Sequence, residues 1–126
     1  MNPEQIVASL KALMEAGQTP GKVLTDAADL ENYGKDWTKI YPPKPVAIVL
    51  PKTTEQVQAL VRFANENQVA LVPSGGRTGL SAGAVAANGE VVVAFDNMNQ
   101  ILDFSASDRT VKCQAGVVTE QLQTYA

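Results

Sequence analysis

Residues 45–72, PVAIVLPKTTEQVQALVRFANENQVALV, decide the fold of this chain. Residues 46–50 are a continuous apolar run between two prolines, which is typical of a strand buried on both faces. Residues 69–72, VALV, are a second run of the same kind. A helical pattern separates the two runs, so the stretch predicts a parallel βαβ unit with a right-handed crossover.

The helical pattern begins at TTEQ, where Thr53 and Gln56 occupy the two reciprocal positions of a capping box. The apolar residues that follow repeat with a helical period, and those expected on one face are Val57, Leu60, Val61 and Ala64. We therefore expect an amphipathic helix between the two strands.

A glycine-rich run follows the second strand. Residues 73–86, PSGGRTGLSAGAVA, contain the four glycines Gly75, Gly76, Gly79 and Gly83. Glycine is costly to order, so a cluster of glycines in a folded loop needs a reason. The run leaves the carboxyl end of a parallel strand, where ligands bind in open α/β sheets. We therefore expect a ligand to approach this backbone closely.

Two common designs for phosphate binding fit the run poorly. A P-loop needs a lysine, and none occurs between Lys52 and Lys112. The dinucleotide fingerprint needs Gly-x-Gly-x-x-Gly at the start of a helix, whereas this run reads Gly-Gly-x-x-Gly-x-x-x-Gly without a clear helix. A flexible linker or a tight hairpin is the structural alternative, although linkers seldom separate two strongly apolar strands.

A third design uses consecutive backbone amides in a tight curl, where glycines adopt positive φ angles and form a concave anion site. The donors expected here are the amides of Gly75, Gly76, Thr78, Gly79 and Ser81, with hydroxyls from Ser74, Thr78 and Ser81. Arg77 carries the only charge of the run. We predict that the run holds a pyrophosphate.

The rest of the chain predicts a mixed α/β (α+β) fold, with parallel strands first and antiparallel strands later. Residues 91–95 read as a third buried strand, and residues 101–104 and 110–115 as an antiparallel hairpin. The second hairpin strand alternates in polarity, and Cys113 is interpreted as a small buried hydrophobic residue.

The segment before the βαβ unit predicts two helices. The first is capped by Asn2 and ended by Gly17, and a short one covers residues 27–33. A loosely structured approach surrounds the short helix, and its expected packing anchors are Tyr33, Trp37 and Tyr41. At the other end, residues 119–126 begin a helix without a stop signal, so we expect a cut chain there.

The composition of the chain disfavours several classes of function. The chain has 126 residues, of which 45% are hydrophobic and 18% charged, as in one globular domain. Its net charge of −3 disfavours nucleic acid as a partner. It has no histidine and a single cysteine, so we expect no metal site, no histidine catalysis and no internal disulfide within it. No secretion signal and no apolar run of about 20 residues occurs, so we expect no transmembrane segment.

Three stretches together carry a family resemblance: the glycine-rich run, the βαβ stretch before it, and FDNMNQIL…DRTVKCQAGVVTEQLQ after it. From about residue 22 to 126 the chain resembles the FAD-linked oxidase family, also called the vanillyl-alcohol oxidase or p-cresol methylhydroxylase type. Within that family it is most similar to bacterial D-2-hydroxyglutarate dehydrogenases, with D-lactate dehydrogenases and glycolate oxidase FAD subunits next. The resemblance implies the N-terminal part of a p-cresol methylhydroxylase-type FAD-binding domain, with FAD held between two small α/β subdomains.

The resemblance also implies which residues bind FAD. In the run they are Pro73, Ser74, Gly75, Gly76, Arg77, Thr78, Gly79 and Ser81. A second segment, which passes close to the flavin in relatives, matches Gln114, Ala115, Gly116 and Val117, and a nearby turn matches Met98 and Asn99. Some relatives attach FAD to a histidine directly after the paired glycines. Arg77 stands at that position, which implies non-covalent FAD.

For the whole protein, the resemblance implies an FAD-dependent oxidoreductase acting on the CH–OH group of a D-2-hydroxy acid of the D-2-hydroxyglutarate, D-lactate or glycolate class. Hydride would pass from C2 of the substrate to the flavin, and electrons then to a carrier protein or quinone. Residues 1–41 would be a helical and extended lead-in, and residues 42–126 the first half of the FAD-binding domain. The substrate domain and all catalytic residues would lie beyond residue 126, so the fragment alone is expected to be inactive.

The partners expected from the resemblance are the small hydroxy acid, the electron acceptor and a second copy of the chain in a homodimer. The expected location is the cytoplasm, or the inner membrane as a peripheral protein. Two other readings of the residues stay open. One is a nucleotide- or sugar-phosphate-binding module without redox activity, and the other is a purely structural interaction domain.

Overall fold

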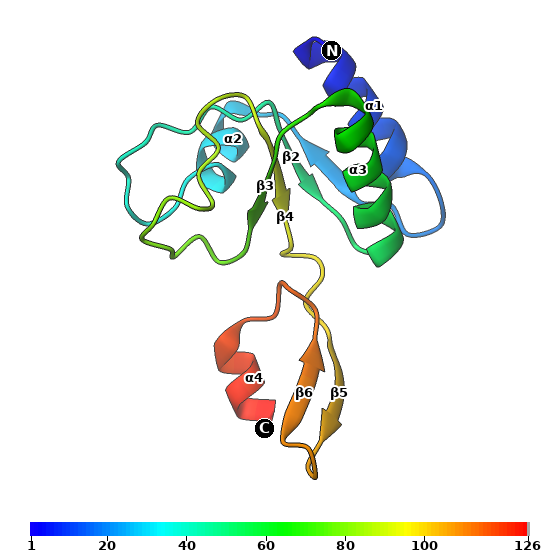
Figure 1. Cartoon of the computed structure of the whole chain (residues 1–126), viewed down its shortest axis with the longest axis vertical. Helices are drawn as coiled ribbons and strands as arrows, with labels where there is room; N and C mark the ends of the chain where they lie inside the picture. Colours follow the sequence, from blue (N-terminus) through cyan, green and yellow to red (C-terminus); the bar gives the residue numbers. More distant parts are fainter. Residues whose placement is uncertain (126) are drawn as a thin grey trace.

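The computed structural model describes residues 1–125. They form a four-stranded sheet of order β1-β2-β4-β3 and a separate β5-β6 hairpin that carries the last helix (Figure 1). The mixed α/β fold, parallel first and antiparallel later, is therefore confirmed. In chain order the elements are α1 (Pro3–Glu15), β1 (Lys22–Leu24), α2 (Ala27–Tyr33), β2 (Ala47–Leu50), α3 (Thr54–Asn67), β3 (Leu71–Ser74), β4 (Val91–Ala94), β5 (Ile101–Ser105), β6 (Thr110–Cys113) and α4 (Thr119–Tyr125).

The predicted βαβ unit is present as β2, α3 and β3. Its two strands are not neighbours, because β4 lies between them and pairs in parallel with both. β3 begins at Leu71 instead of residue 69 and includes Pro73. It is an edge strand, and an edge tolerates proline because one side of the strand needs no amide donor.

Both faces of the sheet are covered, and successive side chains of the central strands point to opposite faces. α1 and α3 lie on one face, where Leu10 and Leu60 are fully buried (Figure 1). On the other face Leu30 of α2 packs against the cluster that contains Ile48. This two-sided cover explains why β2 and β4 consist of apolar residues alone.

The first 41 residues supply more structure than the sequence indicated. The first helix is confirmed, with Asn2 and Gln5 forming a complete capping box. The short helix at residues 27–33 is also confirmed. The strand β1, which the sequence analysis assigned to a loose approach, pairs antiparallel with the free edge of β2.

The cap of α3 differs from the predicted capping box in one half. The Thr53 hydroxyl accepts a hydrogen bond from the Gln56 amide at 3.1 Å, as expected. The Gln56 side chain, however, accepts from the Lys52 amide at 2.7 Å and donates to the Thr19 carbonyl at 2.6 Å. Gln56 therefore joins α3 to the segment after α1 instead of closing the box. The predicted apolar face is also too wide, since Val61 is exposed.

Two packing predictions are wrong. Trp37 and Tyr41 are not anchors, because their side chains are 65% and 53% exposed, whereas Tyr33 is partly buried against the sheet. Cys113 is exposed instead of buried. The hairpin is confirmed, but it is a two-stranded sheet with no fully buried side chain among residues 101–113, so the alternation in β6 marks no core face.

The last predicted helix is present as α4, whose residue Tyr125 packs edge-on against Phe104 of the hairpin at 6.1 Å between ring centroids. Ala126, the end of that predicted helix, lies outside the described residues. Within residues 1–125, no helix has both the length and the hydropathy needed to cross a membrane.

Candidate functional site

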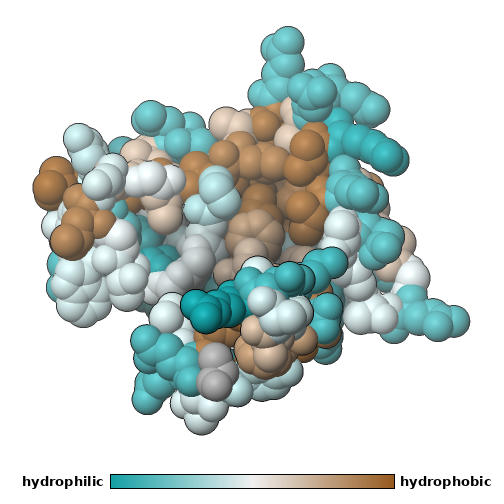
Figure 2. All heavy atoms as spheres, turned by 60° about the horizontal axis from the view of Figure 1, so that its bottom comes forward, coloured by the Kyte–Doolittle hydropathy of each residue, from teal (hydrophilic) through white to brown (hydrophobic). Residues whose placement is uncertain are grey.

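A cavity of about 510 Å³ opens at the carboxyl ends of β3 and β4, between the loop after β3 and the segment that leads into α4. Figure 2, in which the hairpin side comes forward, shows apolar surface in the hollow behind the hairpin. The cavity is lined by the loop after β3, the turn after β4 and the segment from β6 into α4. The lining residues are Gly75, Gly76, Arg77, Thr78, Asp96, Asn99, Ala115, Gly116, Val117, Val118, Thr119, Glu120 and Gln121.

The structure brings the two predicted segments together at this cavity. From the glycine-rich run, four of the predicted residues line it: Gly75, Gly76, Arg77 and Thr78. From the second segment the lining residues are Ala115, Gly116 and Val117, and from the turn between them Asn99. The lining does not include Pro73, Ser74, Gly79, Ser81, Gln114 or Met98. Of these, Ser74 and Met98 are buried, at 1% and 7% exposure.

Sequence reasoning missed Asp96 and residues 118–121 in the cavity wall. A signal for Asp96 was available. It follows β4 closely, as Gly75 follows β3, and the carboxyl ends of parallel strands meet at one edge of a sheet. For residues 118–121 the sequence offered only the start of a helix, which says nothing about what that helix faces.

The glycines of the loop do not adopt the predicted conformation. None of Gly75, Gly76, Gly79 and Gly83 has a positive φ angle. The left-handed residues of the loop are instead Arg77, at φ 60°, and Ala82, at φ 62°. The expectation that glycines supply the left-handed positions of the curl is therefore wrong.

The loop glycines also face open space. A Cβ atom added at Gly75, Gly79 or Gly83 would meet no atom within 4 Å, and one at Gly76 would meet only the Thr78 hydroxyl, at 4.0 Å. Neither backbone strain nor internal packing therefore explains these glycines. At Gly75 and Gly76, which line the cavity, the absence of a side chain leaves the main chain uncovered toward the cavity.

Gly116, across the cavity, differs from the loop glycines because backbone atoms surround it closely. A Cβ atom there would lie 1.7 Å from the Phe95 carbonyl oxygen and 2.9 Å from that of Met98. The Gly116 amide donates to the Met98 carbonyl at 2.9 Å. Gly116 is thus required for packing, because it lets the segment after β6 press against the turn after β4.

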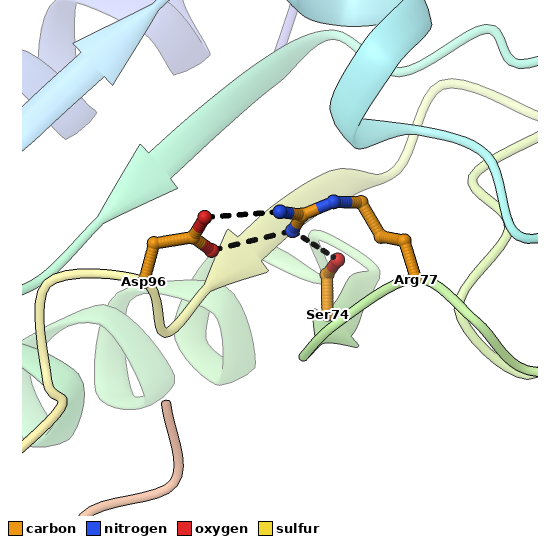
Figure 3. Close-up of polar contacts among 3 residues, drawn as sticks. All are labelled: Ser74, Arg77 and Asp96. Atoms are coloured by element: carbon orange, nitrogen blue, oxygen red, sulfur yellow. Dashed lines mark hydrogen bonds and ion pairs between the residues drawn. The ribbon is translucent and has the colours of Figure 1, made fainter. Parts of the chain in front are cut away.

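The guanidinium of Arg77 forms its polar contacts with other residues of the protein (Figure 3). Its guanidinium donates to both carboxylate oxygens of Asp96, at 2.9 and 3.2 Å, and to the Ser74 hydroxyl, at 3.1 Å. It also lies over the ring of Tyr33, 4.6 Å from the centroid. The positive charge expected beside a bound anion is therefore balanced by Asp96. The Ser74 hydroxyl is hydrogen-bonded to Arg77 within the loop.

Comparison with known proteins gives a family. A family model described as an FAD binding domain matches residues 45–126. The D-2-hydroxyglutarate dehydrogenase of Stutzerimonas stutzeri is 65% identical over 126 residues, all of this chain and 26% of that protein. The mitochondrial D-2-hydroxyglutarate dehydrogenase of Danio rerio is 37% identical over 106 residues, which are 84% of this chain and 20% of that protein.

A solved structure has the same fold as this chain. A crystal structure of p-cresol methylhydroxylase with substrate bound matches with a TM-score of 0.78 and 25% identity, over 97% of this chain and 24% of that one. The chain spans about a quarter of the length of the Stutzerimonas relative. The p-cresol methylhydroxylase-type fold expected from the sequence is therefore confirmed for the part described.

Proposed function

This chain belongs to the FAD binding domain family, and on that premise we propose that its glycine-rich loop, residues 75–86, holds the pyrophosphate of FAD. One observation carries the proposal. Gly75 and Gly76 line the cavity, need no left-handed φ and face open space where a side chain would stand. Such bare main chain suits a ligand that approaches backbone amides closely.

The charge around the cavity fits an anion held by dipoles. Arg77 and Asp96 balance each other, Glu120 adds a negative charge to the lining, and the chain as a whole has a net charge of −3. A pyrophosphate would therefore be held by fixed amide and hydroxyl donors of the loop, for which Gly75, Gly76 and Thr78 are the lining candidates. Burial in a cleft strengthens such hydrogen bonds, because the local dielectric constant is lower than in water.

The opposite wall would face the rest of the cofactor. Ala115, Gly116 and Val117 line it, and we assign them to the flavin, ribityl or adenosine part of FAD. The other residues carried over from the family would act as supports. The Gln114 side chain accepts from the Gln100 amide at 3.0 Å, and the Gly79 carbonyl accepts from the Trp37 amide at 3.2 Å. Pro73 and Ser81 stay predictions of the resemblance.

FAD is proposed to bind without a covalent link to the loop. Arg77 occupies the position at which some family members carry a histidine attached to FAD, and a guanidinium engaged by Asp96 and Ser74 is no nucleophile. Cys113 lies outside the cavity lining. The expected result is FAD released by acid denaturation.

For the whole protein we propose a flavin-dependent D-2-hydroxy-acid dehydrogenase, with D-2-hydroxyglutarate as the first substrate to test. The support is the name and the 65% identity of the Stutzerimonas relative. The chemistry that FAD supplies when bound is acceptance of a hydride from C2 of the hydroxy acid, with the electrons passing on to a carrier protein or quinone. Residues 1–125 would bind and orient the cofactor, and the catalytic groups are proposed to lie outside them.

The division of the chain, the partners and the location remain predictions. Residues 42–126 are proposed as the first half of the FAD-binding domain, preceded by the lead-in of residues 1–41. A homodimer and a cytoplasmic or peripheral inner-membrane location are retained as expectations, and the name of the Danio relative adds the mitochondrion as a location within the family.

The proposed function is tested by measuring flavin absorption in the purified full-length protein. We expect a flavin absorption band at about 450 nm that D-2-hydroxyglutarate bleaches without oxygen. A protein that binds ADP or another phosphate ester but never flavin would support the module without redox activity instead. A protein that binds neither would leave the structural domain as the explanation.

A further inference from the structure

The glycine-rich loop has two left-handed residues that are not glycine, and each is held by a different aspartate. A non-glycine residue with positive φ is strained and persists only where its surroundings fix it. Arg77, at φ 60°, is fixed through its own side chain by Asp96. Ala82, at φ 62°, has no polar side chain, and its amide donates to the Asp36 carboxylate at 2.9 Å.

Asp36 is buried although it is acidic. The residue is 3% exposed, and its carboxylate accepts hydrogen bonds from the Thr38 amide at 2.8 Å and the Thr38 hydroxyl at 2.5 Å, besides the one from Ala82. All these donors are uncharged. Buried carboxylates are rare without compensation, so the hydrogen bonds are what keep this one in place. The Thr38 hydroxyl is also the main cause that lowers the pKa of Asp36, so the carboxylate is ionised at neutral pH.

The segment that contains Asp36, residues 34–37, is hydrogen-bonded to the far half of the loop, residues 79–86. The Trp37 amide donates to the Gly79 carbonyl at 3.2 Å, and the Ala86 amide donates to the Gly34 carbonyl at 2.9 Å. Asp36 sits between these two backbone bonds in the sequence and adds the side-chain contact to Ala82. Neither Asp36 nor Ala82 lines the cavity.

We propose that Asp36 is a positioning residue for the cofactor site. By holding the Ala82 amide, it fixes the far half of the loop, residues 79–86. Asp96 fixes the near half, residues 75–78, through Arg77. The two carboxylates together hold the curl so that the amides of Gly75, Gly76 and Thr78 stay open toward the cavity. The loop glycines can then lie next to the ligand, while the strained left-handed backbone positions fall on Arg77 and Ala82. The inference rests on the proposed function, because the ligand in question is the pyrophosphate of FAD.

The test is Asp36→Asn in the full-length protein. Asparagine can keep the contact with Thr38 or the one with Ala82, but its NH₂ group cannot accept from the remaining amide donor. We expect the dissociation constant for FAD to rise at least about tenfold, as for loss of a hydrogen bond to a charged group. Asp26→Asn is the matched control, since Asp26 is exposed and its side chain makes no capping hydrogen bond. It should bind FAD like the wild type.

Hydrogen exchange separates positioning from a general loss of stability. In Asp36→Asn without flavin, the amides of residues 79–86 should exchange faster, while those of β2 and β4 keep their protection. Equal acceleration in the sheet would mean that Asp36 stabilises the whole fold, and would overturn the proposal. If the variant does not fold, Thr38→Val takes its place. It removes one bond to the carboxylate, and unchanged FAD affinity and loop exchange would overturn the proposal as well.

Failure of the inference and failure of the function can be told apart. A wild-type protein without affinity for FAD contradicts the proposed function. A wild-type protein that binds FAD, with an Asp36→Asn variant that binds it equally well, contradicts only the role of Asp36.

Discussion

Arg77 and Asp96 join the ends of two neighbouring parallel strands by a pair of hydrogen bonds, at 2.9 and 3.2 Å. Arg77 follows β3, Asp96 follows β4, and both line the cavity. Their charges cancel, so this pair adds no net charge to the cavity lining, where the other charged residue is Glu120. A bidentate pair of this kind also fixes geometry, because the planar guanidinium matches the carboxylate at both oxygens.

Replacing Arg77 by lysine should weaken FAD binding although the positive charge is kept. Lysine cannot make the bidentate contact or lie flat over Tyr33, so the near half of the loop loses its fixed geometry. We expect a rise of about tenfold in the FAD dissociation constant, measured by flavin fluorescence titration. Arg62→Lys on the exposed side of α3 is the matched control. Equal affinities of Arg77→Lys and wild type would show that charge alone suffices.

Gly76→Val should abolish flavin retention while the protein stays folded. A Cβ atom added there meets only the Thr78 hydroxyl, at 4.0 Å, so the side chain begins in open space but fills the place proposed for the pyrophosphate. Flavin content per protein, read from visible absorbance, should fall to background, with the far-UV circular dichroism unchanged. The control is Gly83→Ala, whose Cβ also meets open space but lies outside the cavity lining, and it should retain flavin. Full flavin content in Gly76→Val would refute the assignment of the loop.

Gly116→Ala should destabilise the fold itself. A methyl group 1.7 Å from the Phe95 carbonyl oxygen forces the backbone apart, and overpacking of this kind costs about 2 kcal/mol or more in the free energy of unfolding. Urea denaturation followed by circular dichroism measures the loss. Gly79→Ala has open space and no positive φ, so its midpoint should stay within error of the wild type or rise slightly. Similar midpoints for both variants would contradict the packing role of Gly116.

Acid should remove the contribution of Asp36 to stability. Its pKa is lowered below the ordinary value of 3.8 by its hydrogen bonds, first of all that from the Thr38 hydroxyl. A lowered pKa in the folded state means stability that is present above pH of about 4 and is lost as the pH falls through the folded pKa. The difference in unfolding midpoint between wild type and Asp36→Asn should therefore shrink between pH 6 and pH 3. A difference that stays constant over that range would show that the carboxylate charge plays no part.

The central part of the fold could be predicted because its signals are local. β2 and β4 are apolar throughout, and Thr53 marks the start of α3, so strand, helix and strand follow from neighbouring residues. β1 could not be predicted in the same way. It has three residues and exists because the edge of β2 offers it hydrogen bonds, which a local pattern does not reveal.

Part of the cavity lining could be predicted from the sequence, but the side chains that hold the loop by hydrogen bonds could not. The paired glycines and the segment at residues 115–117 line one cavity, as the family resemblance implied. The contact between Asp36 and Ala82 joins residues that are 46 positions apart, and no spacing rule predicts it. Asp96 could have been found from its place just after β4, although its contact with Arg77, 19 positions away, could not. The exposure of Trp37 was missed for a related reason, since an aromatic residue in a loop is buried only where another segment covers it.

A crystal structure of the full-length protein with flavin bound tests the central claim most directly. We expect phosphate oxygens of FAD within about 3 Å of backbone amides of Gly75, Gly76 or Thr78. Phosphates bound at another part of the molecule, with these amides facing only water, would contradict the account.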